Sequence, residues 1–304
     1  MKGRSAVVSI DGKELKLSNL DKVLWPKAGF TKAHVIEYYS KVAPVLLPHL
    51  RERALTLKRY PDGVEGNFFY EKSCPAYAPS WVKRAGVYSE TRGEDINFCV
   101  VDDVASLVWL ANLADLELHT YLSKARDPMM PTAMVFDLDP GPGTDVVDCA
   151  KVAILIRDML KDLGLESFAK TSGSKGMQFY VPLNTPVSYE ETKPLARALG
   201  EILERERPDE VTTNMKKSER EGRIFIDWSQ NDDHKTTVCV YSLRARDQPT
   251  VSTPLTWKEV EKIATSGDAA LARFLPDEVL ARVKKHGDLF EPVLTLEQTL
   301  PALV

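Results

Sequence analysis

Two aspartates one residue apart end an apolar run near the middle of the chain. Residues 134–139 alternate as a β-strand does, so Asp137 and Asp139 lie on one face and the apolar side chains on the other. The Pro-Gly-Pro-Gly segment at 140–143 then predicts the end of the strand. Such a carboxylate pair can bind a divalent cation, because ligand sites of α/β sheets often lie at strand ends. The same pattern also occurs in metal-dependent glycosyltransferases and aspartate-nucleophile phosphatases, so other residues must decide.

A third carboxylate lies near the end of a second predicted strand, within residues 223–228. Asp227 shares a strand face with Arg223 and Phe225. Two cations about 3.5–4 Å apart need roughly three carboxylates, and in phosphoryl transfer they stabilise the attacking and leaving oxygens. Hard oxygen ligands suit Mg²⁺ or Mn²⁺. We therefore expect Asp137, Asp139 and Asp227 to form one two-metal site.

A turn rich in glycine and serine separates the carboxylate segments. It joins predicted strands at 167–171 and 177–182. Its glycines let backbone N–H groups approach an anion, the Ser172 hydroxyl can donate a hydrogen bond, and Lys175 adds a positive charge. The spacing is not that of a Walker loop, and no helix follows directly. The turn is thus either a phosphate site or an ordinary Gly/Ser hairpin.

The net charge of −4 hides an uneven distribution along the chain. Residues 1–60 hold twelve Lys and Arg against five Asp and Glu, which gives 12 − 5 = +7 and leaves −4 − 7 = −11 for the rest. A basic segment on an acidic body is typical of a localised phosphate-binding surface, although lysine-rich helix faces can also be merely solvated.

Length and composition favour a globular intracellular protein. With 304 residues and 43% hydrophobic content, the chain can bury a large core as one domain or two intimate subdomains. There is no apolar run of transmembrane length and no signal-peptide pattern at the N-terminus. The four cysteines form no C-x-x-C pair, which argues against a zinc site and suits a reducing cytosol.

Hydrophobic periodicity predicts a β-α-β-type core with further helices. The predicted helix at 145–163 has its apolar residues on one face, and Gly164 ends it. Predicted helices cover residues 32–50, 102–114, 145–163 and 188–205, with more from 256 onward. Predicted strands cover residues 54–59, 134–139, 167–171, 177–182, 222–227 and 237–243.

Several motifs in order resemble one known family. They are DLDPGPGT at 137–144, TSGSKGMQ at 171–178, FIDWSQN at 225–231 and YSLRAR at 241–246. Together with segments 19–26, 57–69 and 293–298, they make nearly the whole chain similar to the polymerase module of prokaryotic DNA ligase D, a branch of the archaeo-eukaryotic primases. The resemblance implies an α+β fold with a mixed, RNA-recognition-like sheet flanked by helices. It also implies one catalytic domain over residues 1–304, with a DNA-binding subdomain at 1–130 and a catalytic subdomain at 131–304.

The resemblance assigns roles to the nucleotide-binding residues. Asp137, Asp139 and Asp227 would hold two Mn²⁺ or Mg²⁺ ions. Further nucleotide contacts would come from His119, Ser172, Lys175, Gln178, Gln230 and Arg244. We expect Arg244 to share a strand face with Val238, Val240 and Ser242. The family usually has histidine at position 178, and glutamine there can donate a hydrogen bond but cannot carry charge. We therefore expect a weaker triphosphate contact there.

The resemblance also assigns the DNA contacts. Asn19, Lys22 and Lys32 are similar to a pocket for a 5′-phosphate across a gap, and Lys58 and Arg59 would continue that basic surface. The neighbouring rings Phe68 and Phe69 look like a pair that stacks on template bases. They follow a turn and precede charged residues, so we expect them to protrude.

These features predict a polymerase that adds NTPs or dNTPs to DNA 3′ ends at gaps and double-strand breaks in non-homologous end joining. We expect a Ku-type end-binding protein, a separate ligase and a separate nuclease as partners, no membrane association, and a cytoplasmic, nucleoid-associated location. The alternatives are a primase that starts strands unaided and a catalytically weak module that binds and bridges DNA ends.

Overall fold

The computed structural model describes residues 4–90 and 92–301. The chain forms two compact units, each assembled from segments far apart in the sequence. Unit 1 comprises Met1–Tyr121, Thr236–Val251 and Leu275–Gly287; unit 2 comprises Leu122–Lys235, Ser252–Phe274 and Asp288–Val304. The sequence predicted two subdomains with one boundary at residue 130. The observed units have several boundaries, because the chain returns to unit 1 after residue 235 and again after residue 274.

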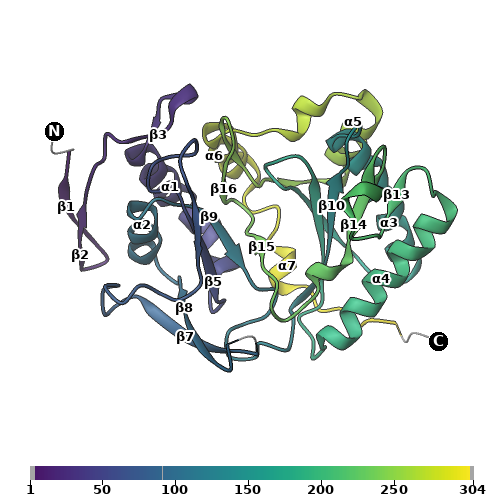
Figure 1. Ribbon diagram of the computed structural model, residues 1–304, viewed down its shortest axis with the longest axis horizontal. Coiled ribbons are helices and arrows are strands. Elements are labelled where there is room, and N and C mark those ends of the chain that lie inside the picture. Colours follow the sequence, from purple (N-terminus) through teal and green to yellow (C-terminus); the bar gives the residue numbers. More distant parts are fainter. Residues whose placement is uncertain (1–3, 91, 302–304) are drawn as a thin grey trace. The chain divides into compact units, whose positions relative to one another are not determined.

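A six-stranded sheet with the order β13-β14-β10-β12-β11-β18 organises unit 2. Figure 1 labels β10, β13 and β14 of this sheet. Its neighbours pair antiparallel except β13 with β14, which is parallel. The strands are β10 (Ala133–Pro140), β11 (Phe168–Thr171), β12 (Met177–Pro182), β13 (Val211–Thr212), β14 (Ile224–Asp227) and β18 (Pro254–Leu255). The helices of this unit are α3 (Val146–Asp162), α4 (Tyr189–Glu206), α5 (Trp257–Ser266) and α7 (Pro292–Thr295).

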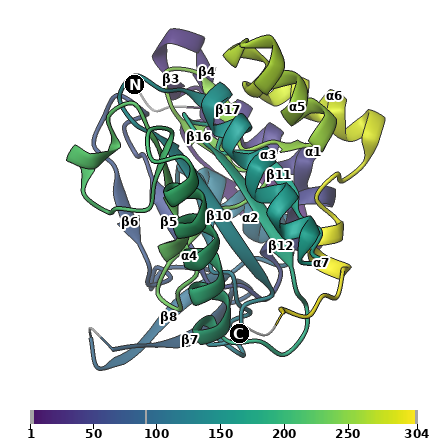
Figure 2. The same ribbon diagram turned by 90° about the vertical axis from the view of Figure 1, so that its right-hand side faces the viewer.

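Helices α3 and α4 cover one face of this sheet (Figure 2). Phe136 of β10 stacks on Phe179 of β12 with ring centroids 4.9 Å apart, and both are fully buried against the helices. Burying one such side chain contributes roughly 1.5–3 kcal/mol. Because β10 alternates, Asp137 and Asp139 point away from this apolar layer. The helices thus leave the carboxylate face of the sheet uncovered by this core.

Local sequence explains where α3 and α4 begin. Asp145 precedes α3, and its carboxylate accepts a hydrogen bond from the Val147 N–H at 2.8 Å. In the first turn of α4, the Glu191 carboxylate accepts hydrogen bonds from both the N–H and the hydroxyl of the preceding cap residue Ser188, each at 2.8 Å. Caps of this type satisfy N–H groups that have no partner within the helix.

Unit 1 contains a second sheet with the path β15-β9-β5-β8-β7, and β6 pairs with β5. The strands of this sheet are β5 (Leu55–Arg59), β6 (Phe69–Glu71), β7 (Lys83–Ser89), β8 (Glu94–Val100), β9 (Asp115–Thr120) and β15 (Thr237–Val238). Two-stranded pairs are formed by β1 (Ala6–Ile10) with β2 (Lys13–Leu17), β3 (Val23–Trp25) with β4 (Phe30–Thr31), and β16 (Leu243–Ala245) with β17 (Pro249–Val251). The helices are α1 (Lys32–Leu50), α2 (Val104–Asn112) and α6 (Pro276–His286).

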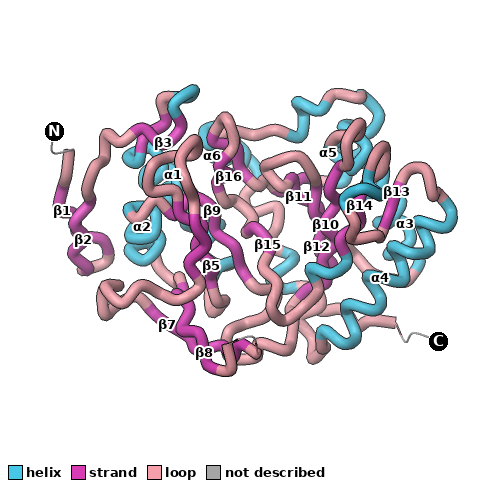
Figure 3. Tube along the Cα trace, in the orientation of Figure 1, coloured by secondary structure: helices cyan, strands magenta, loops and turns pink. Residues whose placement is uncertain are grey.

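Two expectations from the sequence are corrected in unit 1. The strand predicted at 237–243 is wrong, because a loop separates β15 from β16 (Figure 3) and Tyr241 has a left-handed φ of 65°. Arg244 therefore does not share a continuous strand face with Val238. Cysteines 74 and 99 are joined by a disulfide, since the Cys74 N–H binds the carbonyl of Asn97 and places it beside β8.

The predicted fold class and the ranges of two predicted elements are confirmed. The mixed α and β architecture agrees with the predicted class, and the bounds of α1 and β12 coincide with the predicted ranges. Within the part of the chain that the structure describes, every helix is too short or too polar to cross a bilayer.

Candidate functional site

The register of two neighbouring strands brings the acidic residues of unit 2 to one face. Asp137 on β10 lies directly opposite Asp227 on β14, and Asp139 lies opposite Phe225. Directly opposed residues of an antiparallel pair have Cβ atoms about 4.5–5.5 Å apart. Two residues ninety positions apart (227 − 137) thus become neighbours.

The nearby carboxylates change the pKa of Asp137. Burial and the negative charges of Asp139 and Asp227 raise the pKa of Asp137 to about 7, although a hydrogen bond from Gln178 and the charge of Lys170 oppose this. Like charges held close together disfavour ionisation, and a divalent cation removes that penalty. The three carboxylates supply oxygen ligands, and this set of donors fits Mg²⁺ or Mn²⁺.

Asp227 is fixed by the residues that follow it. Its Oδ1 accepts hydrogen bonds from the Ser229 N–H at 3.0 Å and the Ser229 hydroxyl at 2.5 Å. Its Oδ2 accepts one from the Gln230 amide at 2.8 Å. Gln230 thus orients a carboxylate here, a contact that the sequence did not predict.

A buried lysine supports Gln178 from behind the carboxylates. Lys170 on β11 is opposite Gln178 on β12 and is 0% exposed. Its ammonium donates to the Gln178 Oε1 at 2.6 Å and to the Ser252 hydroxyl at 2.8 Å. Because Oε1 accepts from Lys170, the amide N–H groups are the ones available to Asp137. Sequence reasoning gave Lys170 no role, although a lysine inside a predicted strand was the available signal.

The glycine and serine turn packs closely on the end of β10. The Ser172 hydroxyl accepts hydrogen bonds from the N–H groups of Ser174 at 3.2 Å and Gly176 at 3.1 Å. A Cβ on Gly176 would lie 2.1 Å from the carbonyl oxygen of Leu138, so only glycine fits there. Lys175 is exposed at the tip. The turn therefore carries its cationic residue at the surface, next to the acidic strand.

In unit 1, His119 and Arg244 meet at a carboxylate. The Glu117 Oε2 lies 3.0 Å from His119 Nε2, 3.3 Å from Lys58 Nζ and 3.3 Å from Arg244 Nε. Although burial raises the pKa of Glu117, the His119 hydrogen bond and the neighbouring positive charges hold it below its ordinary value. Burial lowers the pKa of His119. Glu117 was another residue to which sequence reasoning gave no role.

The residues proposed for a 5′-phosphate gather near the start of α1. The Lys22 N–H binds the Asn19 carbonyl at 3.0 Å, and the Lys32 N–H binds the Lys22 carbonyl at 2.9 Å. The Lys32 ammonium donates to the carbonyl of Asn112 at 2.7 Å, whereas Lys22 pairs with Asp62 at 2.9 Å. Burial and the charges of Lys22 and Arg59 lower the pKa of Lys32 to about 8.

The two phenylalanines of unit 1 are surface residues. Phe68 is 50% and Phe69 is 43% exposed. The Arg59 guanidinium lies 5.2 Å from the Phe69 ring centroid and forms an ion pair with Glu71 at 2.8 Å. An exposed ring backed by a cation can stack on a nucleic-acid base.

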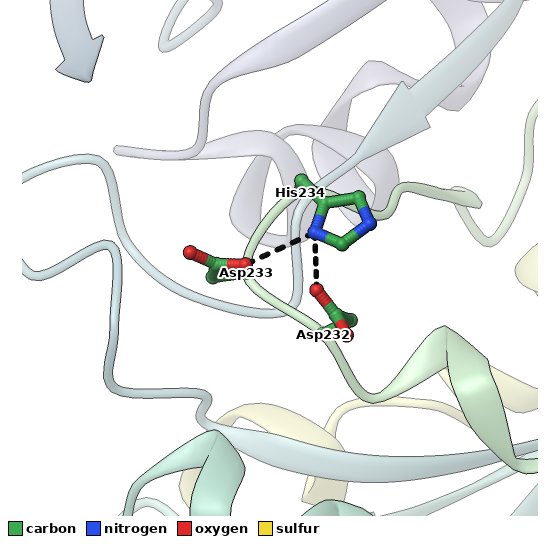
Figure 4. Close-up of side chains that lie close together, drawn as sticks. All are labelled: Asp232, Asp233 and His234. Atoms are coloured by element: carbon green, nitrogen blue, oxygen red, sulfur yellow. Dashed lines mark hydrogen bonds and ion pairs between the residues drawn. The ribbon is translucent and has the colours of Figure 1, made fainter. Parts of the chain in front are cut away.

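One group of carboxylate and imidazole atoms within 4.8 Å of one another occurs in the described residues, at Asp232, Asp233 and His234 (Figure 4). It does not include the strand aspartates. Lys193 forms an ion pair with Asp232 and neutralises part of its charge. Acidic groups at a surface are common without a metal, so we assign this group no role.

The chain is similar to known proteins over most of its length. The model of the LigD primase-polymerase domain matches residues 31–290. The chain is 42% identical to the multifunctional non-homologous end joining DNA repair protein LigD of Mycobacterium tuberculosis, over 93% of this chain and 37% of that protein. It is 34% identical to the bifunctional non-homologous end joining protein LigD of Bacillus subtilis, over 90% of this chain and 43% of that protein.

A solved structure agrees with this similarity. The polymerase domain of Mycobacterium tuberculosis ligase D in complex with DNA superposes with a TM-score of 0.86 at 40% identity, covering 93% of this chain and 99% of that one. The chain spans less than half the length of these curated relatives. The resemblance drawn from the sequence motifs is thereby confirmed: the chain belongs to the LigD primase-polymerase family.

Proposed function

We propose that the protein is a metal-dependent nucleotidyltransferase that adds NTPs or dNTPs to DNA 3′ ends at gaps and double-strand breaks during non-homologous end joining. The main support is the β10 and β14 register, which sets Asp137 opposite Asp227 with Asp139 on the same face. Family membership supports the same chemistry.

Asp137, Asp139 and Asp227 would hold the cations. When bound, two divalent cations supply activation of the primer 3′-hydroxyl and neutralisation of the triphosphate charge. The residues of this chain hold the carboxylates in place. Ser229 and Gln230 orient Asp227, and Gln178 donates to Asp137.

The nucleotide contacts are proposed for each unit by itself. In unit 2, Lys175 at the exposed turn would contact the triphosphate, with Ser172 shaping the turn. Gln178 and Gln230 would act next to the carboxylates they contact, with Gln230 close to the ribose. In unit 1, His119 and Arg244 would act on the nucleotide.

The DNA contacts are proposed for unit 1. Asn19, Lys22 and Lys32 would bind a downstream 5′-phosphate, because burial and the nearby positive charges of Lys22 and Arg59 lower the pKa of Lys32 and an anion there would offset them. Phe68 and Phe69 would stack on template bases, and Lys58 and Arg59 would support them. A relative's polymerase domain has been solved with DNA, which is consistent with this assignment.

The partners and location are also proposals. A Ku-type end-binding protein, a DNA ligase and a nuclease would supply the other steps of end joining, in the cytoplasm at the nucleoid. The LigD names of the relatives support this setting. We propose a two-subdomain organisation in which residues of unit 1 bind DNA and those of unit 2 carry catalysis.

Incorporation assays on matched substrates test the proposal. A gapped duplex with a 5′-phosphate, the same duplex with a 5′-hydroxyl and a primer-free template are each incubated with NTP or dNTP and with Mg²⁺ or Mn²⁺. We expect metal-dependent extension, best on the phosphorylated gap. Synthesis on the primer-free template would instead favour a primase. Phosphate-dependent binding without incorporation would identify an end-bridging module and overturn the proposal.

A further inference from the structure

The buried carboxylate of Glu117 brings together three basic side chains of unit 1. Glu117 on β9 is 1% exposed, and its Oε2 contacts His119, Lys58 and Arg244. The other oxygen, Oε1, accepts a hydrogen bond from the Ala245 N–H at 3.0 Å. These residues come from three strands, β5, β9 and β16, so the carboxylate joins elements that are distant in the sequence.

The ammonium that contacts Glu117 also supports a group of aromatic rings. Lys58 Nζ lies 4.6 Å from the ring centroid of Phe68, 5.4 Å from that of Tyr60 and 5.6 Å from that of Tyr70. Tyr60 and Phe68 are stacked with centroids 5.2 Å apart. A cation under a ring stabilises its position by cation–π attraction, so Lys58 holds the exposed Phe68 ring against the sheet.

Charge balance explains why the carboxylate is needed. Lys58 and Arg244 carry positive charges that repel each other at this separation, and the negative charge of Glu117 offsets the repulsion. His119 is part-buried, and its Nε2–H donates to the same carboxylate oxygen. One carboxylate among these groups leaves an excess of positive charge that can face an anion. Losing the carboxylate would leave the basic groups without a common anchor.

We propose that Glu117 is a positioning residue: it holds His119 and Arg244 for the nucleotide and, through Lys58, the Phe68 ring for the template base. The inference rests on the proposed function, which assigns His119 and Arg244 to the nucleotide and Phe68 to the template base. Nucleotide binding and template stacking in unit 1 then depend on a carboxylate assigned to neither contact.

The test replaces Glu117 by glutamine, which keeps the shape and an acceptor oxygen but removes the charge. The matched control is Asp115→Asn, on the same strand. Asp115 is 0% exposed, and its carboxylate accepts the backbone N–H of Lys58 at 2.7 Å. Both variants change one buried acid of β9 to its amide, so a general effect on the core would appear in both.

Three readouts are measured on the full chain. They are the KM and kcat for nucleotide on a gapped duplex, the fluorescence of 2-aminopurine as the first unpaired template base, and the midpoint of thermal unfolding. For Glu117→Gln we expect KM for nucleotide to rise about tenfold, which corresponds to the loss of one charge-assisted contact, and kcat to change less than about threefold. The 2-aminopurine signal should lose its protein-induced change. Asp115→Asn should leave KM and fluorescence at the wild-type values.

A combined variant separates positioning from plain destabilisation. Because Glu117 acts through His119, Glu117→Gln should raise KM less in a His119→Ala background than in the wild type. Additive effects would overturn the inference, as would a wild-type KM for Glu117→Gln or equal changes in the Asp115→Asn control.

A shorter side chain covers the case in which Glu117→Gln does not fold. Glu117→Asp keeps the charge but withdraws the carboxylate from its 3.3 Å contacts, so KM should rise in the same direction. An unchanged KM and fluorescence in this variant would overturn the inference. If the wild type itself incorporates no nucleotide, the proposed function fails, and the 2-aminopurine signal alone then decides whether Glu117 positions the ring.

Discussion

Replacing Asp137 by asparagine should stabilise the metal-free protein. In the folded chain, burial and the charges of Asp139 and Asp227 raise the pKa of Asp137 to about 7, against an ordinary value of 3.8. An ionised Asp137 is therefore costly when no cation is bound. Asparagine has nearly the same shape and no charge, so it removes this cost.

The size of the effect follows from the pKa difference. A difference of about three pH units corresponds to about 4 kcal/mol at full strength. Asp137 is only partly buried, and water screens its neighbours, so we expect about half, or about 2 kcal/mol. Because the pKa of Asp137 is higher in the folded than in the unfolded state, the folded protein binds an extra proton between about pH 4 and pH 7. The stability of the wild type therefore falls as the pH rises through this window. The gain from asparagine should be about 2 kcal/mol at pH 8 and about 1 kcal/mol at pH 5.

Urea unfolding in EDTA at pH 5 and pH 8 measures this gain. The control is Asp209→Asn, which changes an exposed aspartate of the same unit and should leave the midpoint unchanged at both pH values. Adding Mn²⁺ at pH 8 should stabilise the wild type more than the asparagine variant, because only the wild type keeps all three carboxylates. A variant less stable than wild type at pH 8, or a gain independent of pH, would refute the electrostatic reasoning.

Three further predictions concern binding and folding. The preference for a 5′-phosphorylated gap over a 5′-hydroxyl gap should weaken between pH 7 and pH 9, because Lys32, with its pKa lowered to about 8, loses its proton over this range. Fluorescence anisotropy of labelled gaps measures the preference, and a constant preference would contradict the prediction. Gly176→Ala should destabilise folding by about 3 kcal/mol or more, since its Cβ would lie 2.1 Å from a backbone oxygen, whereas Gly86→Ala, with its nearest atom at 3.5 Å, should be far milder in the same urea assay. Asn231→Ala should cost about 2–4 kcal/mol, because the buried amide accepts from the Val135 N–H and donates to the Val135 carbonyl, each at 2.8 Å; unchanged urea stability would show that this pair contributes nothing.

Elements with strong periodicity were predictable from the sequence. The α1 helix has a regular apolar face and begins after a Thr31 cap, and its predicted bounds match the observed ones. Strands β10 and β14 are apolar runs that end in aspartates followed by turn residues, so the two-residue period of a strand placed their aspartates on matching faces. Hydrophobic periodicity and helix capping depend on residues close together in the chain, so they can be recognised in one sequence.

Contacts between distant segments were much less predictable. Glu117 and Lys170 both lie in strands, but their partners come from other strands whose register the sequence does not specify. The break between β15 and β16 lies at Tyr241, which has a left-handed φ of 65° and whose carbonyl accepts a hydrogen bond from the Tyr38 hydroxyl at 2.8 Å. The Cys74–Cys99 disulfide likewise follows from the placement of Cys74 beside β8. Tertiary packing decides each of these, and spacing along the chain does not report it.

The most direct test of the central claim is primer extension on a phosphorylated gap with Mn²⁺, comparing wild type, Asp227→Asn and Asp233→Asn. Asp227 lies opposite Asp137, whereas Asp233 belongs to the separate acidic group near the surface. We predict that Asp227→Asn lowers kcat by about a thousandfold or more, with the Kd for DNA within about twofold of wild type, and that Asp233→Asn extends normally. Wild-type extension by Asp227→Asn, or its loss in Asp233→Asn alone, would contradict the assignment of the strand aspartates as the metal site.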